Sequence, residues 1–211
     1  MGYPKEMNPK ITIILPTYNR KILLKRALNS IPSSKDYQVI MIDDGSTDGS
    51  WHLIEEWFET NKDKIHLSSR GLKLHANQGI ATAMNTGFDL AKGEYIVSLS
   101  DDDYYLKDFT EFMPYLDGKN DLIYFDLEIN DGSVWHLDEK SKEQYVGAVK
   151  FMRRAFLGDT RVPDLRFRED MPFSQELYAK NPREVFTGIV LKHYNFPHRG
   201  SLTWEACDGK L

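Results

Sequence analysis

Several features are scarce or missing in this sequence of 211 residues. Cys207 is the only cysteine, so no disulfide can form within the chain, and we expect a reducing compartment, the cytoplasm. Positive charge is not in excess, because the formal net charge is -5 and the pI is about 5.7. This argues against general nucleic-acid binding, which depends on Lys and Arg at the phosphates.

Long apolar runs and glycine-rich nucleotide loops are also missing. No apolar run approaches the length of a membrane span, and residues 1–10 are polar rather than a hydrophobic signal core. We therefore expect at most peripheral contact, at the inner face of a membrane. Neither a dinucleotide fingerprint nor a Walker-type loop appears, which disfavours dehydrogenases and NTPases. With 41% hydrophobic and 12% aromatic residues, the chain can bury the core of one domain.

Strands and helices are predicted to alternate through the first half of the chain. Apolar runs rich in Ile and Val predict buried strands, and apolar residues at helical spacing predict the helices between them. This alternation predicts an α/β fold with a mostly parallel sheet, whose ligands bind beyond the carboxyl ends of the strands. The predicted strands are 11–15, 38–42 and 95–99, while 65–74 reads as one strand or two. The predicted helices are 24–31, 51–59 and 75–92, the last ending in a basic turn at Lys92 before Gly93.

Three consecutive carboxylates, Asp101, Asp102 and Asp103, follow the third of these strands. Like charges repel, so a cluster of this kind points to a positive partner, and a hard divalent cation takes oxygen ligands. The alternative is a solvated acidic loop. Because residues 17–19 and Asp43-Asp44 lie at the same predicted sheet edge, the sequence favours a ligand crevice there. Its groups suit a nucleotide, with Tyr18 packing on the base or ribose.

Four stretches together resemble the successive signatures of family 2 glycosyltransferases with the GT-A fold. They are residues 15–20 (LPTYNR), 42–48 (IDDGSTD), 77–87 (with NQG and NTG) and 93–103 (GEYIVSLSDDD). The resemblance implies one GT-A-type domain, with residues of about 10–105 as the nucleotide-sugar half and 106–211 as a smaller, mixed acceptor half. The sequence departs from the family pattern at Ser100, where many relatives have Asp, and at Lys107, where proline is common.

The resemblance also implies roles for individual residues. A family 2 enzyme transfers a sugar with inversion from a nucleotide-diphosphate sugar, with UDP favoured here, and uses Mn²⁺ or Mg²⁺. Asp102 would hold the metal, while Tyr18 and Asp44 would contact the nucleobase and Asp101 the ribose. The full nucleotide-binding set is Pro16, Thr17, Tyr18, Asn19, Asp44, Asn77 and Asp101. The departure at Ser100 leaves open how the three carboxylates divide these duties.

The second half of the chain supplies the candidate base. Single displacement needs a group that takes the proton of the acceptor hydroxyl. By position in the resemblance this base is Asp170, with Glu169 orienting the acceptor; the alternative is that Asp170 caps a helix starting near Pro172. His198 and Arg199 lie in a stretch similar to the family's closing segment, which implies contact with the diphosphate or metal.

Other predictions for the second half concern its secondary structure. A short helix is predicted over 108–116, and a hairpin of strands 122–125 and 134–137 turns at 130–132. Within 145–157 a helix is predicted to carry Lys150, Arg153 and Arg154, as a solvated basic face or as a phosphate or lipid-headgroup contact.

The expected partners are the sugar donor and a glycan or lipid-linked acceptor. Three other functions stay open at this point: a binding module that has kept the pocket without transfer, a sugar-nucleotide pyrophosphorylase, and a phosphorelay receiver. The pyrophosphorylase is disfavoured because its glycine-rich opening with Arg and Lys is missing after the first strand. A receiver does not fit the closing segments. Metal-dependent turnover of a sugar donor would separate a transferase from a binding module.

Overall fold

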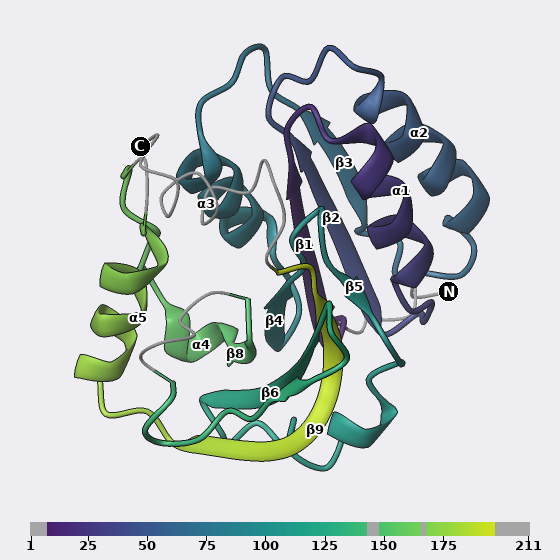
Figure 1. Ribbon diagram of the computed structural model, residues 1–211. Helices are drawn as coiled ribbons and strands as arrows, with labels where there is room; N and C mark the ends of the chain where they lie inside the picture. Colours follow the sequence, from purple (N-terminus) through teal and green to yellow (C-terminus); the bar gives the residue numbers. More distant parts are fainter. Residues whose placement is uncertain (1–7, 143–147, 166–167, 197–211) are drawn as a thin grey trace, which may run out of the picture.

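The centre of the fold is one mixed sheet (Figure 1), seen in a computed structural model that describes residues 8–142, 148–165 and 168–196. The strand order is β3-β2-β1-β4-β8-β6-β9-β5, and β7 pairs with β6 outside this path. The first four strands of the path are parallel and come from the first half of the chain. They are β1 (Ile11–Thr17), β2 (Tyr37–Asp43), β3 (Arg70–Lys73) and β4 (Tyr95–Ser98).

Helices cover both faces of this parallel part, which explains why every residue of β1 and β2 is buried. In Figure 1, α1 and α2 lie on one side of the sheet and α3 on the other. The α3 helix packs so closely that a Cβ added at Gly87 would lie 2.5 Å from Ile14 Cγ2, so only glycine fits there. These helices are α1 (Lys21–Ser30), α2 (Ser50–Asn61) and α3 (Ile80–Leu90).

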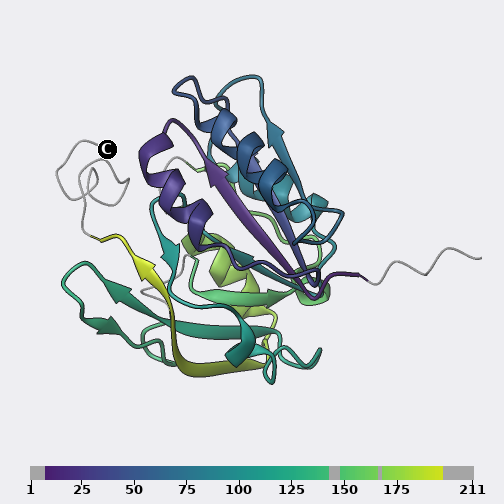
Figure 2. The same ribbon diagram turned by 90° about the vertical axis from the view of Figure 1, so that its right-hand side faces the viewer.

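The second half of the chain extends the same sheet. β8 is antiparallel to β4 and β6, and the long strand β9 is parallel to β6. Figure 2 shows β9, in yellow, lying beside β6 and below β1. The elements are β5 (Tyr104–Tyr105), a 3₁₀ turn η1 (Thr110–Phe112), β6 (Leu122–Ile129), β7 (Val134–Trp135), β8 (Lys150–Arg153), α4 (Arg154–Leu157), α5 (Asp170–Ala179) and β9 (Glu184–Tyr194).

The structure confirms the predicted α/β fold with its mostly parallel sheet in the first half of the chain, and also the hairpin, formed by β6 and β7. Of the ambiguous segment 65–74, only β3 is a strand. No helix among the described residues combines the length and the apolarity needed to cross a membrane.

Four secondary-structure predictions were wrong. The helix predicted within 145–157 is mostly strand β8, because these residues pair with β4 and β6; only Arg154–Leu157 is helical, and 143–147 lie outside the described residues. The predicted helix over 108–116 is reduced to η1. The helix predicted over 75–92 is only α3, which ends at Leu90 rather than at Lys92, and α5 begins at Asp170 rather than near Pro172.

The basic residues of β8 form no solvated face. Lys150 is buried, and Arg153 pairs with Asp121, whose carboxylate also accepts hydrogen bonds from Arg183. The sequence pattern could not reveal this burial. The spacing of basic residues along the chain is the same whether they are solvated or buried with an acidic partner.

Candidate active site

Asp101 lies at the carboxyl end of β4 and is held by the end of β1. The hydroxyl of Thr17 donates a hydrogen bond of 2.7 Å to Asp101 Oδ2. Burial raises the pKa of Asp101 to about 7, against the opposing effects of the Thr17 hydrogen bond and the Arg20 charge. The predicted convergence of these two strand ends is therefore present in the structure, and Asp101 is a buried group that can exchange a hydrogen bond with a ligand hydroxyl.

Asp103 belongs to the core rather than to the open side of this loop. Its Oδ2 lies 2.9 Å from Lys192 Nζ, and the two side chains are 1% and 2% exposed. Its Oδ1 accepts a hydrogen bond of 3.0 Å from the Asn195 backbone N–H. Burial raises the pKa of Asp103, and the Lys192 charge opposes the rise. Asp103 thus anchors the end of β9 to the acidic loop, a role that the sequence did not indicate.

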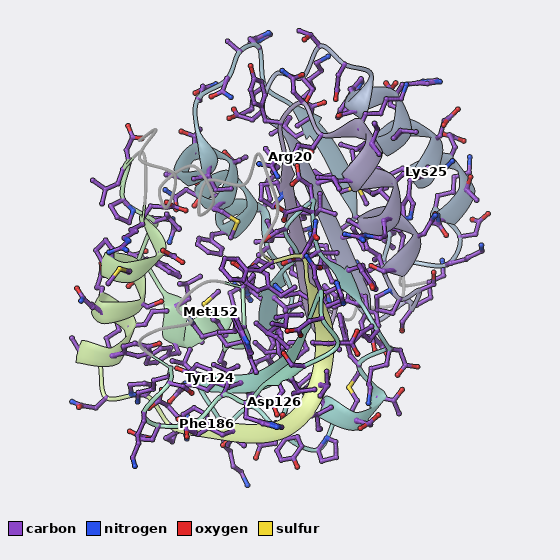
Figure 3. The ribbon with its side chains drawn as sticks, viewed as in Figure 1. Arg20, Lys25, Tyr124, Asp126, Met152 and Phe186 are labelled. Carbon is purple, nitrogen blue, oxygen red and sulfur yellow. The ribbon has the colours of Figure 1, made fainter. Side chains whose placement is uncertain are left out.

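Asp102 pairs with an arginine at the edge of the sheet. Arg20 Nη1 lies 2.9 Å from Asp102 Oδ2, and Arg26 Nη2 donates to the Asp102 backbone oxygen at 2.8 Å. Figure 3 shows Arg20 at the end of β1, above the sheet. Arg20 ends the first motif, LPTYNR, in which the resemblance gives it no role, and no motif includes Arg26. The Arg20 pair shows that the geometry at Asp102 accommodates positive charge.

The residues around Asp102 fit one kind of metal site. Within residues 8–142, 148–165 and 168–196 no three His, Cys, Asp or Glu side chains gather closely enough to cage an ion. Mg²⁺, however, is usually bound through one or two carboxylates together with substrate phosphates and water. Asp102, with Asp101 beside it, provides that donor set. The site therefore fits a cation whose coordination a diphosphate would complete, rather than one that the protein binds alone.

Asp44 joins the end of β2 to the start of α3. Its Oδ1 and Oδ2 accept hydrogen bonds of 2.8 Å each from the backbone N–H groups of Gln78 and Gly79. A carboxylate at a helix N-terminus is favoured by the helix dipole. Each carboxylate oxygen has a further lone pair, so Asp44 can hold this turn and still accept from a base. Asn77, next to this turn, is exposed, and its predicted contact with the nucleotide stays a prediction.

The loop after β1 is shaped by Asn19, which adopts a positive φ of 51°. Its backbone N–H donates to Ser46 Oγ at 2.9 Å, and its side-chain oxygen accepts from the Thr47 N–H at 2.8 Å. Asn19 therefore fixes this loop against the loop after β2. Tyr18 is 43% exposed beside it, so its ring is available to a ligand, while Pro16 is buried in β1.

Asp43 is a residue at this edge to which the sequence assigned no separate role. Its Oδ1 accepts a hydrogen bond from the Ser46 N–H at 2.6 Å. Its Oδ2 is buried and receives no hydrogen bond from the described residues. This oxygen can therefore accept a further hydrogen bond at the carboxyl end of β2.

Glu169 and Asp170 lie at the start of α5, and both are partly exposed. Burial raises the pKa of each carboxyl, and for Asp170 the charges of Lys150 and Arg168 oppose the rise. Backbone N–H groups of Asp170 and Met171 also stabilise the ionised carboxylate, so the alternative of a helix-terminal role is compatible with the structure.

The α5 helix is held beside α3. Phe173 stacks on Phe88 with ring centroids 5.7 Å apart, and Figure 1 shows both helices on the same side of the sheet. Glu169 and Asp170 lie at the start of α5, and the turn held by Asp44 lies at the start of α3, so the two helices in contact connect these two parts of the site. His198 and Arg199 lie outside the described residues, so their predicted contact stays a prediction.

The curated proteins similar to this chain include two glycosyltransferases from bacteria. The putative teichuronic acid biosynthesis glycosyltransferase TuaG of Bacillus subtilis is 26% identical over 217 residues, covering 94% of this chain and 84% of TuaG. A GalNAc(5)-diNAcBac-PP-undecaprenol beta-1,3-glucosyltransferase of Campylobacter jejuni is 35% identical over 97 residues. That match covers 45% of this chain and 30% of the Campylobacter protein, so the chain spans less than a third of that relative.

Solved structures share the fold. Staphylococcus aureus TarS 1-349 in complex with UDP-GlcNAc aligns with a TM-score of 0.76 at 22% identity, over 91% of this chain and 60% of the TarS chain. The mannosyltransferase PcManGT of Pyrobaculum calidifontis, in complex with GDP-Man and Mn²⁺, aligns with a TM-score of 0.71 at 20% identity, over 94% of this chain and 60% of that chain. The family profile described as Glycosyl transferase family 2 matches residues 12–169. With its GT-A fold, the chain belongs to glycosyl transferase family 2.

Proposed function

We propose that the protein is a metal-dependent, inverting glycosyltransferase. It moves a sugar, in the favoured case from a UDP-sugar, to a hydroxyl group of a glycan or lipid-linked acceptor. The observation that carries the proposal is the meeting of three strand ends at one sheet edge. Thr17 of β1 contacts Asp101 after β4, and Asp44 after β2 holds the turn that starts α3. Such an edge is where α/β sheets bind nucleotides.

The donor would be held by residues of this edge. The exposed ring of Tyr18 offers a face to the base, and Asp44 would accept a hydrogen bond from the base. Asp101 would bind the ribose hydroxyls. A divalent cation held at Asp102, when bound, would neutralise charge on the leaving diphosphate. TarS bound to UDP-GlcNAc and PcManGT bound to Mn²⁺ share the fold, which supports the proposal of a UDP-sugar and Mn²⁺ or Mg²⁺.

The proton of the acceptor would pass to Asp170. An ionised carboxylate at this position takes the hydroxyl proton while the oxygen attacks the anomeric carbon, and the nucleoside diphosphate leaves from the opposite face. Glu169 would orient the acceptor beside it. No covalent intermediate with the protein forms, so the configuration at the anomeric carbon inverts. The name of the Campylobacter relative supports a lipid-linked acceptor, and with it peripheral contact with the membrane.

Replacing the base tests this proposal directly. In Asp170→Asn we expect unchanged UDP binding and a loss of turnover by about 100-fold or more, the usual contribution of a general base. Turnover is measured as UDP released from UDP-GlcNAc with Mn²⁺ present, together with product formation on a panel of glycan and polyprenol-linked acceptors. The matched control is Asp159→Asn, which changes an exposed carboxylate in the loop after α4.

Two results would contradict the proposal. Full turnover in Asp170→Asn would exclude this residue as the base. Donor binding without any turnover in the unmodified protein, across the donor and acceptor panels, would instead favour the binding module of the same fold.

A further inference from the structure

A buried lysine lies against the helix that carries the proposed base. Lys150 is on β8 and is only 3% exposed. Its Nζ lies 3.3 Å from the hydroxyl of Ser174, on α5, and 5.9 Å from the ring centre of Tyr124, on β6. Ser174 follows Asp170 by four residues, so the two side chains lie on the same face of α5, one turn apart. The ammonium group of Lys150 is thus directed at the face of α5 that begins with Asp170.

A lysine this deeply buried needs a negative charge to offset the loss of hydration. Two carboxylates act on Lys150, namely Asp170 and Glu184. Glu184 is already well compensated, because Lys142 Nζ lies 2.6 Å from its Oε2 and the Tyr124 hydroxyl donates to its Oε1 at 2.7 Å. Glu184 therefore has a cation of its own in Lys142, and Asp170 is the other carboxylate that the charge of Lys150 favours.

We infer that Lys150 is a positioning residue that keeps Asp170 ionised and ready to accept a proton. The inference rests on the proposed function, in which Asp170 is the base. Its physical basis is simple: a half-buried carboxylate takes up a proton too readily to act as a base at neutral pH unless a cation favours its charged form. Lys150 supplies that cation from strand β8, in the interior of the protein.

The groups around this pair set its pH dependence. Burial raises the pKa of Asp170, which Lys150 and Arg168 oppose, and the neighbouring Glu169 carries charge of the same sign. Burial lowers the pKa of Lys150 to about 8, although Asp170 and Glu184 act to raise it. Above this pH Lys150 loses its charge, and its effect on Asp170 is lost with it.

The test is the titration of Asp170 itself, followed by NMR of protein labelled with ¹³C at the aspartate side-chain carboxyls. The Asp170 signal is identified by its absence in Asp170→Asn. In Lys150→Met, an apolar replacement of similar shape, we expect the pKa of Asp170 to rise by about one unit or more, the usual effect of removing a nearby opposite charge. Lys180→Met is the matched control, because it removes a lysine at the opposite end of α5, where Lys180 Nζ donates to the Leu157 backbone oxygen, and it should leave the Asp170 titration unchanged.

A second measurement uses the unmodified protein and does not depend on how Lys150→Met folds. The Asp170 signal should show a second, smaller inflection near pH 8, where Lys150 loses its proton. An unshifted Asp170 titration in folded Lys150→Met, or no second inflection in the unmodified protein, would overturn the inference. Neither result concerns the proposed function, which fails instead if Asp170→Asn keeps full turnover.

Discussion

The ion pair between Asp103 and Lys192 should be one of the most important single contacts for stability. Both side chains are almost completely buried, and the charged atoms lie 2.9 Å apart. Lys192→Met would leave the Asp103 carboxylate in the core without its cation. Removing one partner of such a pair usually costs about 3–5 kcal/mol, because the remaining charge stays buried. A domain of this size is stable by only about 5–15 kcal/mol, so the loss should be large.

The assay is urea unfolding of the single variants Lys192→Met and Asp103→Asn and of the double variant. We expect the double variant to lose less stability than the sum of the two single variants, because it leaves no buried charge without a partner. The control is Lys10→Met. Lys10 pairs with Glu94 at 2.7 Å, but both side chains are substantially exposed, so the loss should stay within about 1 kcal/mol. A loss in Lys192→Met no larger than in Lys10→Met would refute the reasoning.

Two further predictions concern stability. Although burial acts to raise it, hydrogen bonds from Arg183 and Arg153 hold the pKa of Asp121 at about 2. Its stabilisation of about 2 kcal/mol is therefore complete above a pH of about 5 and is lost as the pH falls to about 2 and below. In Asp121→Asn this pH dependence of urea unfolding should be weaker, and an unchanged profile would contradict the assignment. Gly87→Ala places a methyl group against Ile14, and the overpacking cost of about 1–3 kcal/mol should exceed the roughly 1 kcal/mol that alanine gains in a helix. The measurement is the urea midpoint, and a midpoint equal to or above that of the unmodified protein would show that the helix and sheet adapt.

The parallel part of the fold was predictable because each of its elements has a local cause. The runs 11–15 and 38–42 are almost uninterrupted in apolar residues, as expected for strands covered on both faces, and the structure buries every residue of β1 and β2. Parallel pairing alone then brings the polar loops that follow these strands to the same edge of the sheet. The contact between Thr17 and Asp101 is the direct product of that pairing.

The antiparallel part was less predictable because its residues depend on distant partners. The strand β9 was not predicted: its residues are mostly half-buried, and its pairing with β6 joins positions about 60 residues apart. The sequence predicts a helix at Lys150, whereas the structure places this residue on strand β8. Its burial becomes understandable only once α5 and β9 bring acidic groups to it.

The candidate site likewise has a part that the sequence predicts and a part that depends on distant partners. Acidic side chains at strand ends could be found from the sequence, but the partners that distinguish them could not. Asp101 is held by a hydroxyl, Asp102 by arginines, and Asp103 by a buried lysine. Only the middle carboxylate keeps partial exposure next to a cation, which supports its proposed role in metal binding.

The central claim, a metal-assisted site for a nucleotide-sugar donor, is tested most directly by a thermal-shift panel. UDP, GDP, UDP-GlcNAc and GDP-mannose are each added with and without Mn²⁺, to the unmodified protein and to Asp102→Ala. A ligand at a hundred times its dissociation constant adds about 2.7 kcal/mol of stability, or a rise in Tm of about 5–11 °C. We predict such a rise for UDP and its sugar with Mn²⁺ and its loss in Asp102→Ala. A panel without any shift would contradict the claim.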